Sequence, residues 1–263
     1  MNILENKFYS EESVFKPENL LREAKRQKRL SDCNIPKVCL LDPDGDILEY
    51  LLKTNKTSIN KCWACYHTKL YTFNLDEIEF GIIACAVGAS FAVLIAEQLF
   101  VSGCELLISI TSSGIINPSA QNVEYILIEN AIRDEGTSYH YLGPHEVASA
   151  DQEIISILSK DFLKQTGNVN LGQSWTTDAP YRETTSAIQN MKLKNVSVVE
   201  MEAAALYAFA KAKNKKIVCY AHITNSMAQT EKDFEKGLEN GSVTSLQVAY
   251  KTVQHLKDYL QWK

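Results

Sequence analysis

The chain has 263 residues, 45% of them hydrophobic, and a formal net charge of −5. This length and composition fit one large α/β unit whose core needs no disulfide or metal, and the acidic balance argues against a general nucleic-acid or anionic-membrane surface. The longest apolar run, residues 82–95, is interrupted by Gly88 and Ser90 and is too short to cross a bilayer, and the N-terminus lacks the apolar core of a signal peptide. We therefore expect a soluble, cytoplasmic protein that binds neither membrane nor nucleic acid.

The seven cysteines are odd in number and scattered along the chain. Cys62 and Cys65 form a single C-x-x-C pair, but no second Cys/His pair follows at the spacing of a zinc site. Zinc binding and redox chemistry at this pair are therefore minor alternatives, and we expect reduced, mostly buried thiols. The sequence predicts no metal site and no cofactor.

Residues 1–36 are predicted to form an N-terminal helical appendage. Pro17 lies near the first turn of a helix that runs to about Leu30. The one strongly basic run, REAKRQKR at residues 22–29, falls on this helix. It is most simply the solvated face of the helix, with a nucleic-acid contact as the alternative.

The rest of the chain, residues 37–263, alternates apolar strands with helices. Strands are expected at residues 37–41, 80–86, 106–110, 123–131, 168–173, 196–199 and 217–223, and helices at residues 47–53, 91–102, 151–165, 202–213 and 242–262. This alternation predicts an α/β fold whose mostly parallel sheet is covered on both faces. Ligands bind such sheets at the carboxyl ends of the strands, so the segments that follow the strands are the candidate sites.

Two of these segments are polar turns in the predicted structure. Thr111, Ser112 and Gly114 follow the strand at 106–110, and they offer hydroxyls and backbone N–H groups to an anion or a sugar; a plain structural turn is the alternative. Asn225 follows the strand at 217–223, where its amide can pair with a base edge through both a donor and an acceptor.

The third segment places two carboxylates where a strand meets a helix. Glu200 and Glu202 flank Met201 in the run VEMEAAAL. One carboxylate can accept hydrogen bonds from two vicinal hydroxyls while the thioether packs on the apolar face of a sugar ring. A carboxylate at a helix start can also simply complement the helix dipole.

Taken together, these segments resemble the nucleoside phosphorylase superfamily, which comprises purine nucleoside phosphorylases, uridine phosphorylases and methylthioadenosine/S-adenosylhomocysteine nucleosidases. Residues 199–206, VEMEAAAL, are similar to its ribose-binding segment. Residues 109–141 (SITSSGIINPSAQ through SYHY) resemble the phosphate- and ribose-binding region of uridine phosphorylases. Residues 176–181, TTDAPY, resemble its base-pocket segment, and residues 81–99 its glycine-rich strand–turn–helix. The resemblance runs from about Lys37 to the C-terminus.

The resemblance implies a three-layer α/β/α fold with a mixed, largely parallel sheet that forms a distorted barrel. It implies a nucleoside as small-molecule partner and a site near the interface of a homodimer, or of a hexamer built as a trimer of dimers. Met201 and Glu202 would contact the ribose, with Glu202 on the 2′- and 3′-hydroxyls, and Glu200 would line the same pocket. Thr111 and Ser112 would lie at the phosphate or nucleophile side of the sugar.

On the base side, Tyr181 would line the pocket. Arg182 follows it and would either meet a pyrimidine carbonyl or pair with Glu183. Purine-specific relatives protonate the base with an aspartate at the position of Asn225. Because an amide cannot deliver a proton, the identity of the base stays open between purine and pyrimidine.

The phosphate side departs from the family pattern. Ser109 and the loop Asp42–Asp46 stand where phosphorylases carry arginines, and the loop has three carboxylates. Charge-assisted arginine contacts are among the stronger hydrogen bonds to phosphate, so phosphorolysis is disfavoured unless Lys69, Arg133 or a neighbouring subunit supplies the charge. Hydrolytic relatives place a water-activating carboxylate after the first strand, and Asp46 falls near that position, with turn capping as the alternative.

The sequence therefore predicts an enzyme, a nucleoside phosphorylase or a nucleosidase, that cleaves the N-glycosidic bond of a nucleoside, with Asp46 and Asn225 as its catalytic candidates. Phosphate is the co-substrate that the phosphorylase alternative requires. A non-catalytic nucleoside- or nucleotide-binding protein on the same fold is the main alternative, since a fold does not imply a function. A generic α/β binding domain is the third.

Overall fold

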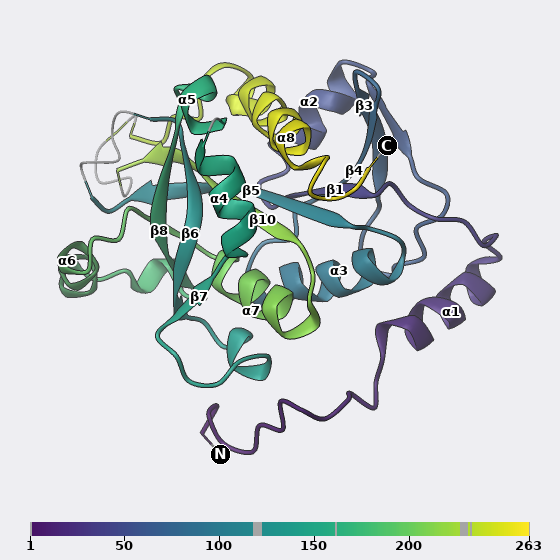
Figure 1. The fold of residues 1–263 in the computed structure, drawn as a ribbon, viewed down its shortest axis with the longest axis horizontal. Helices are drawn as coiled ribbons and strands as arrows, with labels where there is room; N and C mark the ends of the chain where they lie inside the picture. Colours follow the sequence, from purple (N-terminus) through teal and green to yellow (C-terminus); the bar gives the residue numbers. More distant parts are fainter. Residues whose placement is uncertain (1, 118–122, 161, 227–230, 232, 263) are drawn as a thin grey trace.

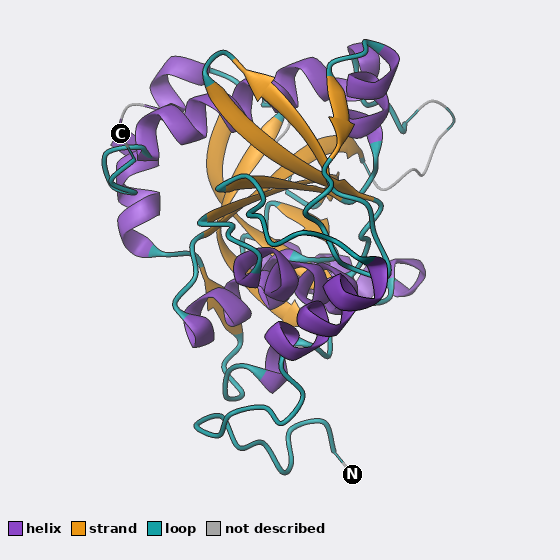
Figure 2. Ribbon diagram, turned by 90° about the vertical axis from the view of Figure 1, so that its right-hand side faces the viewer, coloured by secondary structure: helices purple, strands orange, loops and turns teal. Residues whose placement is uncertain are grey.

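Five strands close into a barrel at the centre of the computed structural model, which describes residues 2–117, 123–160, 162–226, 231 and 233–262 (Figures 1 and 2). The strands are β5 (Leu106–Ile115), β6 (Tyr125–Asp134), β8 (Val169–Thr177), β9 (Val198–Glu200) and β10 (Ile217–Asn225). They follow one another in the order β10–β6–β8–β9–β5, and β5 pairs again with β10. Three of the pairings are parallel, and β5–β9 and β6–β10 are antiparallel, so the barrel is mixed.

The sheet continues beyond β5 and beside β6. Its further strands are β1 (Val38–Asp42), β4 (Ile78–Ala84), β3 (Tyr71–Leu75), β2 (Thr57–Ile59) and β7 (Val147–Ser149). β1 pairs in parallel with both β4 and β5, and every residue of β1 is buried, as expected of a strand covered on both faces. The sequence prediction missed β2, β3 and β7, which are short antiparallel additions without a continuous apolar run.

Helices cover the sheet on both sides (Figure 1). On one side lie α3 (Ala89–Val101) and α7 (Ala203–Lys213), which pack against each other; on the other lie α2 (Asp46–Lys53), α4 (Gln152–Lys160), α5 (Phe162–Thr166) and α8 (Ser242–Leu256). α6 (Thr185–Leu193) lies beyond β8. The three-layer α/β/α architecture with a distorted barrel is therefore confirmed. None of the helices in the described parts of the chain has the length and apolarity that crossing a bilayer requires.

Two segments that were predicted as turns lie in strands. Residues 111–114 continue β5, and residues 224–225 extend β10 beyond the strand predicted at 217–223, because the two strands pair in parallel as far as Gly114 and Asn225. Polar side chains support this pairing: the Ser113 hydroxyl donates to the carbonyl oxygen of His222 at 2.9 Å. The helix predicted at 151–165 is two helices, α4 and α5, and the closing helix ends at Leu256 rather than at 262.

The N-terminal helix is fastened to the rest of the molecule. α1 (Pro17–Lys28) begins with a proline at its first turn and carries basic residues in its last turn. Leu21 and Ala24 pack on Ala64, and the Lys28 ammonium donates to the carbonyl oxygen of Cys65 at 2.5 Å. α1 therefore covers the segment between β2 and β3 as well as the outer side of α3.

A disulfide joins Cys33, in the linker after α1, to Cys62. The expectation that all thiols are reduced is therefore wrong. The prediction weighed only the C-x-x-C pair, whereas Cys62 pairs with a cysteine 29 residues upstream and its neighbour Cys65 stays free and buried. The remaining free cysteines are Cys39, Cys85, Cys104 and Cys219.

Replacing Cys62 with Ser is expected to lower the free energy of unfolding by about 3 kcal/mol under oxidising conditions, because the crosslink restricts the unfolded chain. Denaturant unfolding with and without a dithiol reductant measures this effect, and Cys85→Ser, at an exposed free thiol, is the matched control. Equal stability of Cys62→Ser and the oxidised wild type would contradict the pairing.

Candidate functional site

The start of α7 carries a buried carboxylate with one unpaired oxygen. Glu202 is 1% exposed, and its Oε1 accepts a hydrogen bond from the backbone N–H of Gly88 at 2.7 Å. Gly88 precedes α3 with φ at +89°, a conformation that favours glycine, and this turns its N–H toward Glu202. Oε2 is buried and has no hydrogen-bond partner among the described residues. A buried polar atom without a partner is unusual, and the hydroxyl of a ligand would satisfy it.

Burial and, after it, the charge of Glu200 raise the pKa of Glu202, and the Gly88 N–H and the nearby Thr111 hydroxyl offset part of this rise, so that the pKa lies at about 8. Thr111 is itself buried on β5, and the effect of its hydroxyl on the pKa of Glu202 places the two side chains close together. The site therefore holds a carboxyl group that titrates near neutral pH and lacks one hydrogen-bond partner.

Glu200 differs from Glu202 because both of its oxygens are fully engaged. Oε1 accepts from the Ser174 hydroxyl at 2.9 Å and from the Thr176 hydroxyl at 2.5 Å. Oε2 accepts from the backbone N–H groups of Glu202 and Ala203, both at 2.7 Å. Burial raises the pKa of Glu200, and these hydrogen bonds counteract the rise. Glu200 thus fastens the first turn of α7 to β8, which matches the dipole-complementing role considered for a carboxylate here.

The loop after β1 serves partly as a cap. Asp42 is buried, and it accepts from the backbone N–H groups of Gly45 at 3.1 Å and Leu48 at 2.9 Å. Burial raises the pKa of Asp42 to about 7, against the opposing effect of the Leu48 hydrogen bond. Asp42 therefore holds the turn and the start of α2 together.

The other two carboxylates of this loop face β5 and the segment after β10. Asp44 accepts from the Ser112 backbone N–H at 2.6 Å and from the Ser112 hydroxyl at 2.7 Å. Asp46 accepts from the Lys236 ammonium and, at 2.9 Å, from the amide of Asn240. Lys236 also lies 3.4 Å from Asp44. A lysine that the sequence prediction did not consider thus lies between the two carboxylates.

The two cations considered for a phosphate role, Arg133 and Lys69, lie in different surroundings. The Arg133 guanidinium donates to the Ser138 hydroxyl at 2.8 Å and to the carbonyl oxygens of Leu142, Gly143 and His145 at 2.6 to 3.1 Å. Arg133 therefore holds the loop that follows β6. Lys69 lines a pocket of about 450 Å³ with His67 and Cys85, and no ion pair in the described part of the chain links Lys69 to the Asp42–Asp46 loop.

The base side is more open. Asn225 ends β10 at a break in register opposite Gly114, and its amide donates to the Thr224 hydroxyl at 3.1 Å. Asn225 also lines a pocket of about 350 Å³ with Ser226 and Asp233. Met227, and residues 118–121 of the segment that resembles uridine phosphorylases, lie outside the described residues.

Tyr181, predicted to line the base pocket, is 99% exposed in this single chain. Arg182 is exposed beside it, and no ion pair to Glu183 occurs within the described structure. Burial alone raises the pKa of Glu183 to about 7. Neither Tyr181 nor Arg182 is therefore brought together with Glu202 by the fold of one subunit.

Several residues of this region were missed from the sequence. His222 lies next to Ser112 in the β5–β10 register and stacks on Tyr125, with ring centroids 4.8 Å apart. Burial lowers the pKa of His222. The strand predicted at 217–223 already contained His222, and only the register of β5 with β10 places it beside Ser112. Nothing in the sequence pairs Lys236 with Asp46, which lies 190 positions away.

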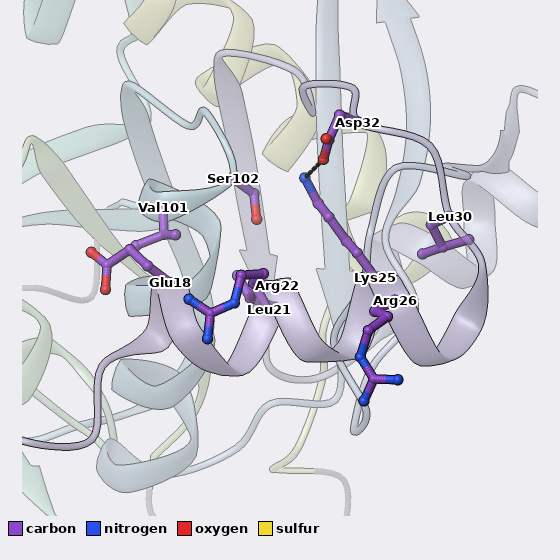
Figure 3. Close-up of a pocket in the computed structure, with 9 residues that line it drawn as sticks. All are labelled: Glu18, Leu21, Arg22, Lys25, Arg26, Leu30, Asp32, Val101 and Ser102. Atoms are coloured by element: carbon purple, nitrogen blue, oxygen red, sulfur yellow. Dashed lines mark hydrogen bonds and ion pairs between the residues drawn. The ribbon is translucent and has the colours of Figure 1, made fainter.

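A pocket of about 510 Å³ lies elsewhere, between α1 and the end of α3 (Figure 3). Its basic side chains have acidic partners: Lys25 lies 3.2 Å from Asp32, and Arg22 and Arg26 both pair with Glu23. These pairs are largely exposed and contribute little energy each. The pocket has the character of a solvated helix face and lacks the buried unpaired group found at Glu202.

The barrel and the carboxylate at the start of α7 define a protein of the nucleoside phosphorylase type. The sequence profile of the phosphorylase superfamily matches residues 37–254. The chain belongs to this superfamily, which confirms the resemblance carried by VEMEAAAL.

Individual relatives are distant. An uncharacterized protein of Acanthamoeba polyphaga mimivirus is 32% identical over 149 residues, and the match covers 57% of this chain and 58% of the viral protein. A 5'-methylthioadenosine/S-adenosylhomocysteine nucleosidase of Desulfotalea psychrophila is 26% identical over 209 residues, covering 73% of this chain and 87% of that protein. Among solved structures, uridine phosphorylase of Vibrio fischeri gives a TM-score of 0.71 at 17% identity, over 89% of this chain and 99% of that one.

The raised pKa of Glu202 predicts a pH-dependent stability. Because the folded state keeps this proton up to about pH 8 and the unfolded state loses it near 4.5, the free energy of unfolding falls as the pH rises through that window. One such group contributes a slope of up to about 1.4 kcal/mol per pH unit. Glu202→Gln removes this contribution.

Denaturant unfolding of both proteins between pH 5 and pH 8 measures the difference. Asp42 and Glu183 titrate in a similar range but are present in both proteins, so the difference isolates Glu202. Parallel pH profiles would show that Glu202 is ionised normally in the folded protein.

Proposed function

We propose that this protein cleaves the N-glycosidic bond of a nucleoside and that water, rather than phosphate, is the nucleophile. The observation that carries the proposal is the buried Oε2 of Glu202, which has no partner in the described structure and lies at one end of a sheet whose neighbouring loop is rich in carboxylates. The membership of the chain in the phosphorylase superfamily supports a nucleoside as the substrate class.

Glu202 is proposed to hold the sugar. Oε2 would accept from one ribose hydroxyl, and the second hydroxyl would share the carboxylate, while half-buried Met201 packs on the ring. Attack at C1′ develops positive charge on the sugar, which a carboxylate in a buried site stabilises more strongly than water does. The Thr111 hydroxyl, which lowers the pKa of Glu202, would help to orient the Glu202 carboxylate.

The nucleophile side is proposed to favour water because of its charge. Asp44 and Asp46 carry two negative charges against the single positive charge of Lys236. Phosphate carries nearly two negative charges and depends on charge-assisted donors, which are scarce here. Both candidate bases already accept hydrogen bonds: Asp46 from Lys236 and Asn240, and Asp44 from Ser112. Each carboxylate oxygen has a second lone pair that can accept from water. Asp44 lies beside Ser112, next to Thr111, so we propose that the two aspartates share the activation of water, with Asp44 nearer the sugar.

The leaving base is proposed to be held by Asn225 through hydrogen bonds without proton donation. The nucleosidase that is 26% identical to this chain supports hydrolysis as the reaction type. We further propose a homo-oligomer, a dimer or a trimer of dimers, in which a neighbouring copy covers the exposed Tyr181 and Arg182. The apolar side chains of Val87 and Leu94, exposed near α3, are consistent with such a contact.

A second candidate function is nucleoside binding without cleavage. Asn225 favours it, because an amide at this position cannot protonate a leaving base. Both functions use the same sugar contacts, so binding alone does not distinguish them.

The deciding experiment is base release from a panel of purine and pyrimidine nucleosides in strictly phosphate-free buffer, followed by titration of phosphate. The purified protein is expected to release base without phosphate. Glu202→Gln is expected to lower kcat/KM by roughly 10- to 100-fold, because an amide cannot take the ionised form that accepts from both ribose hydroxyls and balances the positive charge on the sugar. Glu79→Gln, an exposed carboxylate on β4, is the matched control and should retain wild-type rates.

The outcomes separate the alternatives. Release that requires phosphate would overturn the electrostatic argument for water. Nucleoside binding that depends on Glu202 but yields no free base would establish the second candidate. Neither binding nor release for any member of the panel would contradict both.

A further inference from the structure

Residues 236–242, which lead into α8, contact the loop that follows β1. Lys236 contacts Asp46 and lies 3.4 Å from Asp44, and its side chain is only 18% exposed. Asn240 donates to Asp46 at 2.9 Å, and the hydroxyl of Ser242 donates to the backbone carbonyl of Asp46 at 3.0 Å. Three side chains of one segment therefore converge on the Asp44–Asp46 part of the loop.

The backbone that follows Lys236 has an unusual conformation, which constrains the position of Lys236. Gly237, Glu239, Asn240 and Gly241 all have positive φ, between +49° and +80°. Non-glycine residues rarely adopt this conformation, and it persists where surrounding contacts hold it. A Cβ built on Gly241 would come within 2.3 Å of the His222 ring, so this glycine allows the turn to pack directly on the ring.

Contacts continue from Lys236 to the barrel. Asp44 accepts both the backbone N–H and the hydroxyl of Ser112, and Ser112 is the neighbour of His222 in the β5–β10 register. The residue before Ser112 is Thr111, and its hydroxyl lies close enough to Glu202 to lower the pKa of that carboxyl group. A continuous set of contacts thus joins Lys236, Asp44 and Ser112 to the strand end where the sugar carboxylate lies.

The charge of Lys236 balances an otherwise repulsive group. Burial alone would lower the pKa of Lys236, but the hydrogen bond that Lys236 donates to Asp46 and the charges of Asp44 and Asp46 outweigh burial and raise it, so the ammonium stays charged. Without Lys236, the Asp44 and Asp46 carboxylates would repel each other across the loop. No other Lys or Arg of the described residues pairs with either aspartate.

We propose that Lys236 is a positioning residue for the nucleophile side of the site: it holds the Asp44 carboxylate against Ser112, so that a water bound by Asp44 faces the sugar held by Glu202. This inference rests on the proposed hydrolytic function. Lys236 acts through Asp44 and touches no reacting atom. Lys236 orients Asp44, and Asp44 orients the water. Such positioning affects the rate of base release more than the affinity for the nucleoside.

The test compares Lys236→Met with Lys236→Arg, and with Lys53→Met as the matched control. Lys53 pairs with Glu239 at 3.1 Å and so joins the same segment to α2, but this pair is largely exposed. Lys236→Met is expected to lower kcat for base release by about 10- to 100-fold, with KM for the nucleoside changed by no more than about twofold. Lys236→Arg should recover most of the rate, and Lys53→Met should match the wild type.

A second readout does not need activity. Amide hydrogen exchange at Ser112 should become faster in Lys236→Met, because its N–H donates to an Asp44 that is no longer held, and should stay unchanged in Lys53→Met. Unchanged Ser112 exchange in Lys236→Met would overturn the positioning role, whether or not the protein is active. So would equal loss of rate in Lys236→Met and Lys53→Met, or a loss confined to KM. Absence of base release by the wild type, with altered Ser112 exchange in Lys236→Met, would refute only the proposed function.

Discussion

The fastening of α7 to the barrel by the Glu200 carboxylate is the contact on which the arrangement of the site depends. A buried carboxylate is costly unless its oxygens are hydrogen-bonded, and Glu200 receives two hydroxyl donors from β8 and two backbone donors from the first turn of α7. These bonds fix the position and orientation of the turn that begins with Glu202. The second carboxylate can therefore stay buried with one oxygen unpaired, because its backbone is held by the first.

The two ends of the site differ in how their charges are balanced. At the proposed sugar end, the ionised form of Glu202 has little compensation, and burial together with the charge of Glu200 raises the pKa of this group to about 8. At the proposed nucleophile end, Asp44 and Asp46 share Lys236, which comes from a distant part of the chain. Two carboxylates with one lysine suit a neutral or cationic species better than phosphate, which carries nearly two negative charges. The arginines of the family pattern that are missing here therefore bear directly on the choice between water and phosphate as nucleophile.

The N-terminal helix adds a separate constraint. Its disulfide at Cys62 and its apolar contacts hold the segment between β2 and β3, and that segment contributes His67 and Lys69 to a pocket. The family profile begins at residue 37, so α1 and Cys33 precede the matched region, whereas Cys62 lies inside it. The disulfide therefore ties the N-terminal segment to the part of the chain that the profile matches.

The amino-acid sequence by itself determined the fold class, the superfamily and the run around Glu202, because these depend on local apolar patterns and on a contiguous motif. It did not determine that residues 111–114 and 224–225 belong to strands, since only the pairing of β5 with β10 makes a ladder of such polar segments. It did not reveal Lys236 or the Cys33–Cys62 disulfide, because both join residues that the chain brings together only on folding. Tertiary structure also distinguished the two carboxylates of VEMEAAAL: Glu200 is saturated by donors from β8 and α7, and Glu202 is left with an oxygen to share.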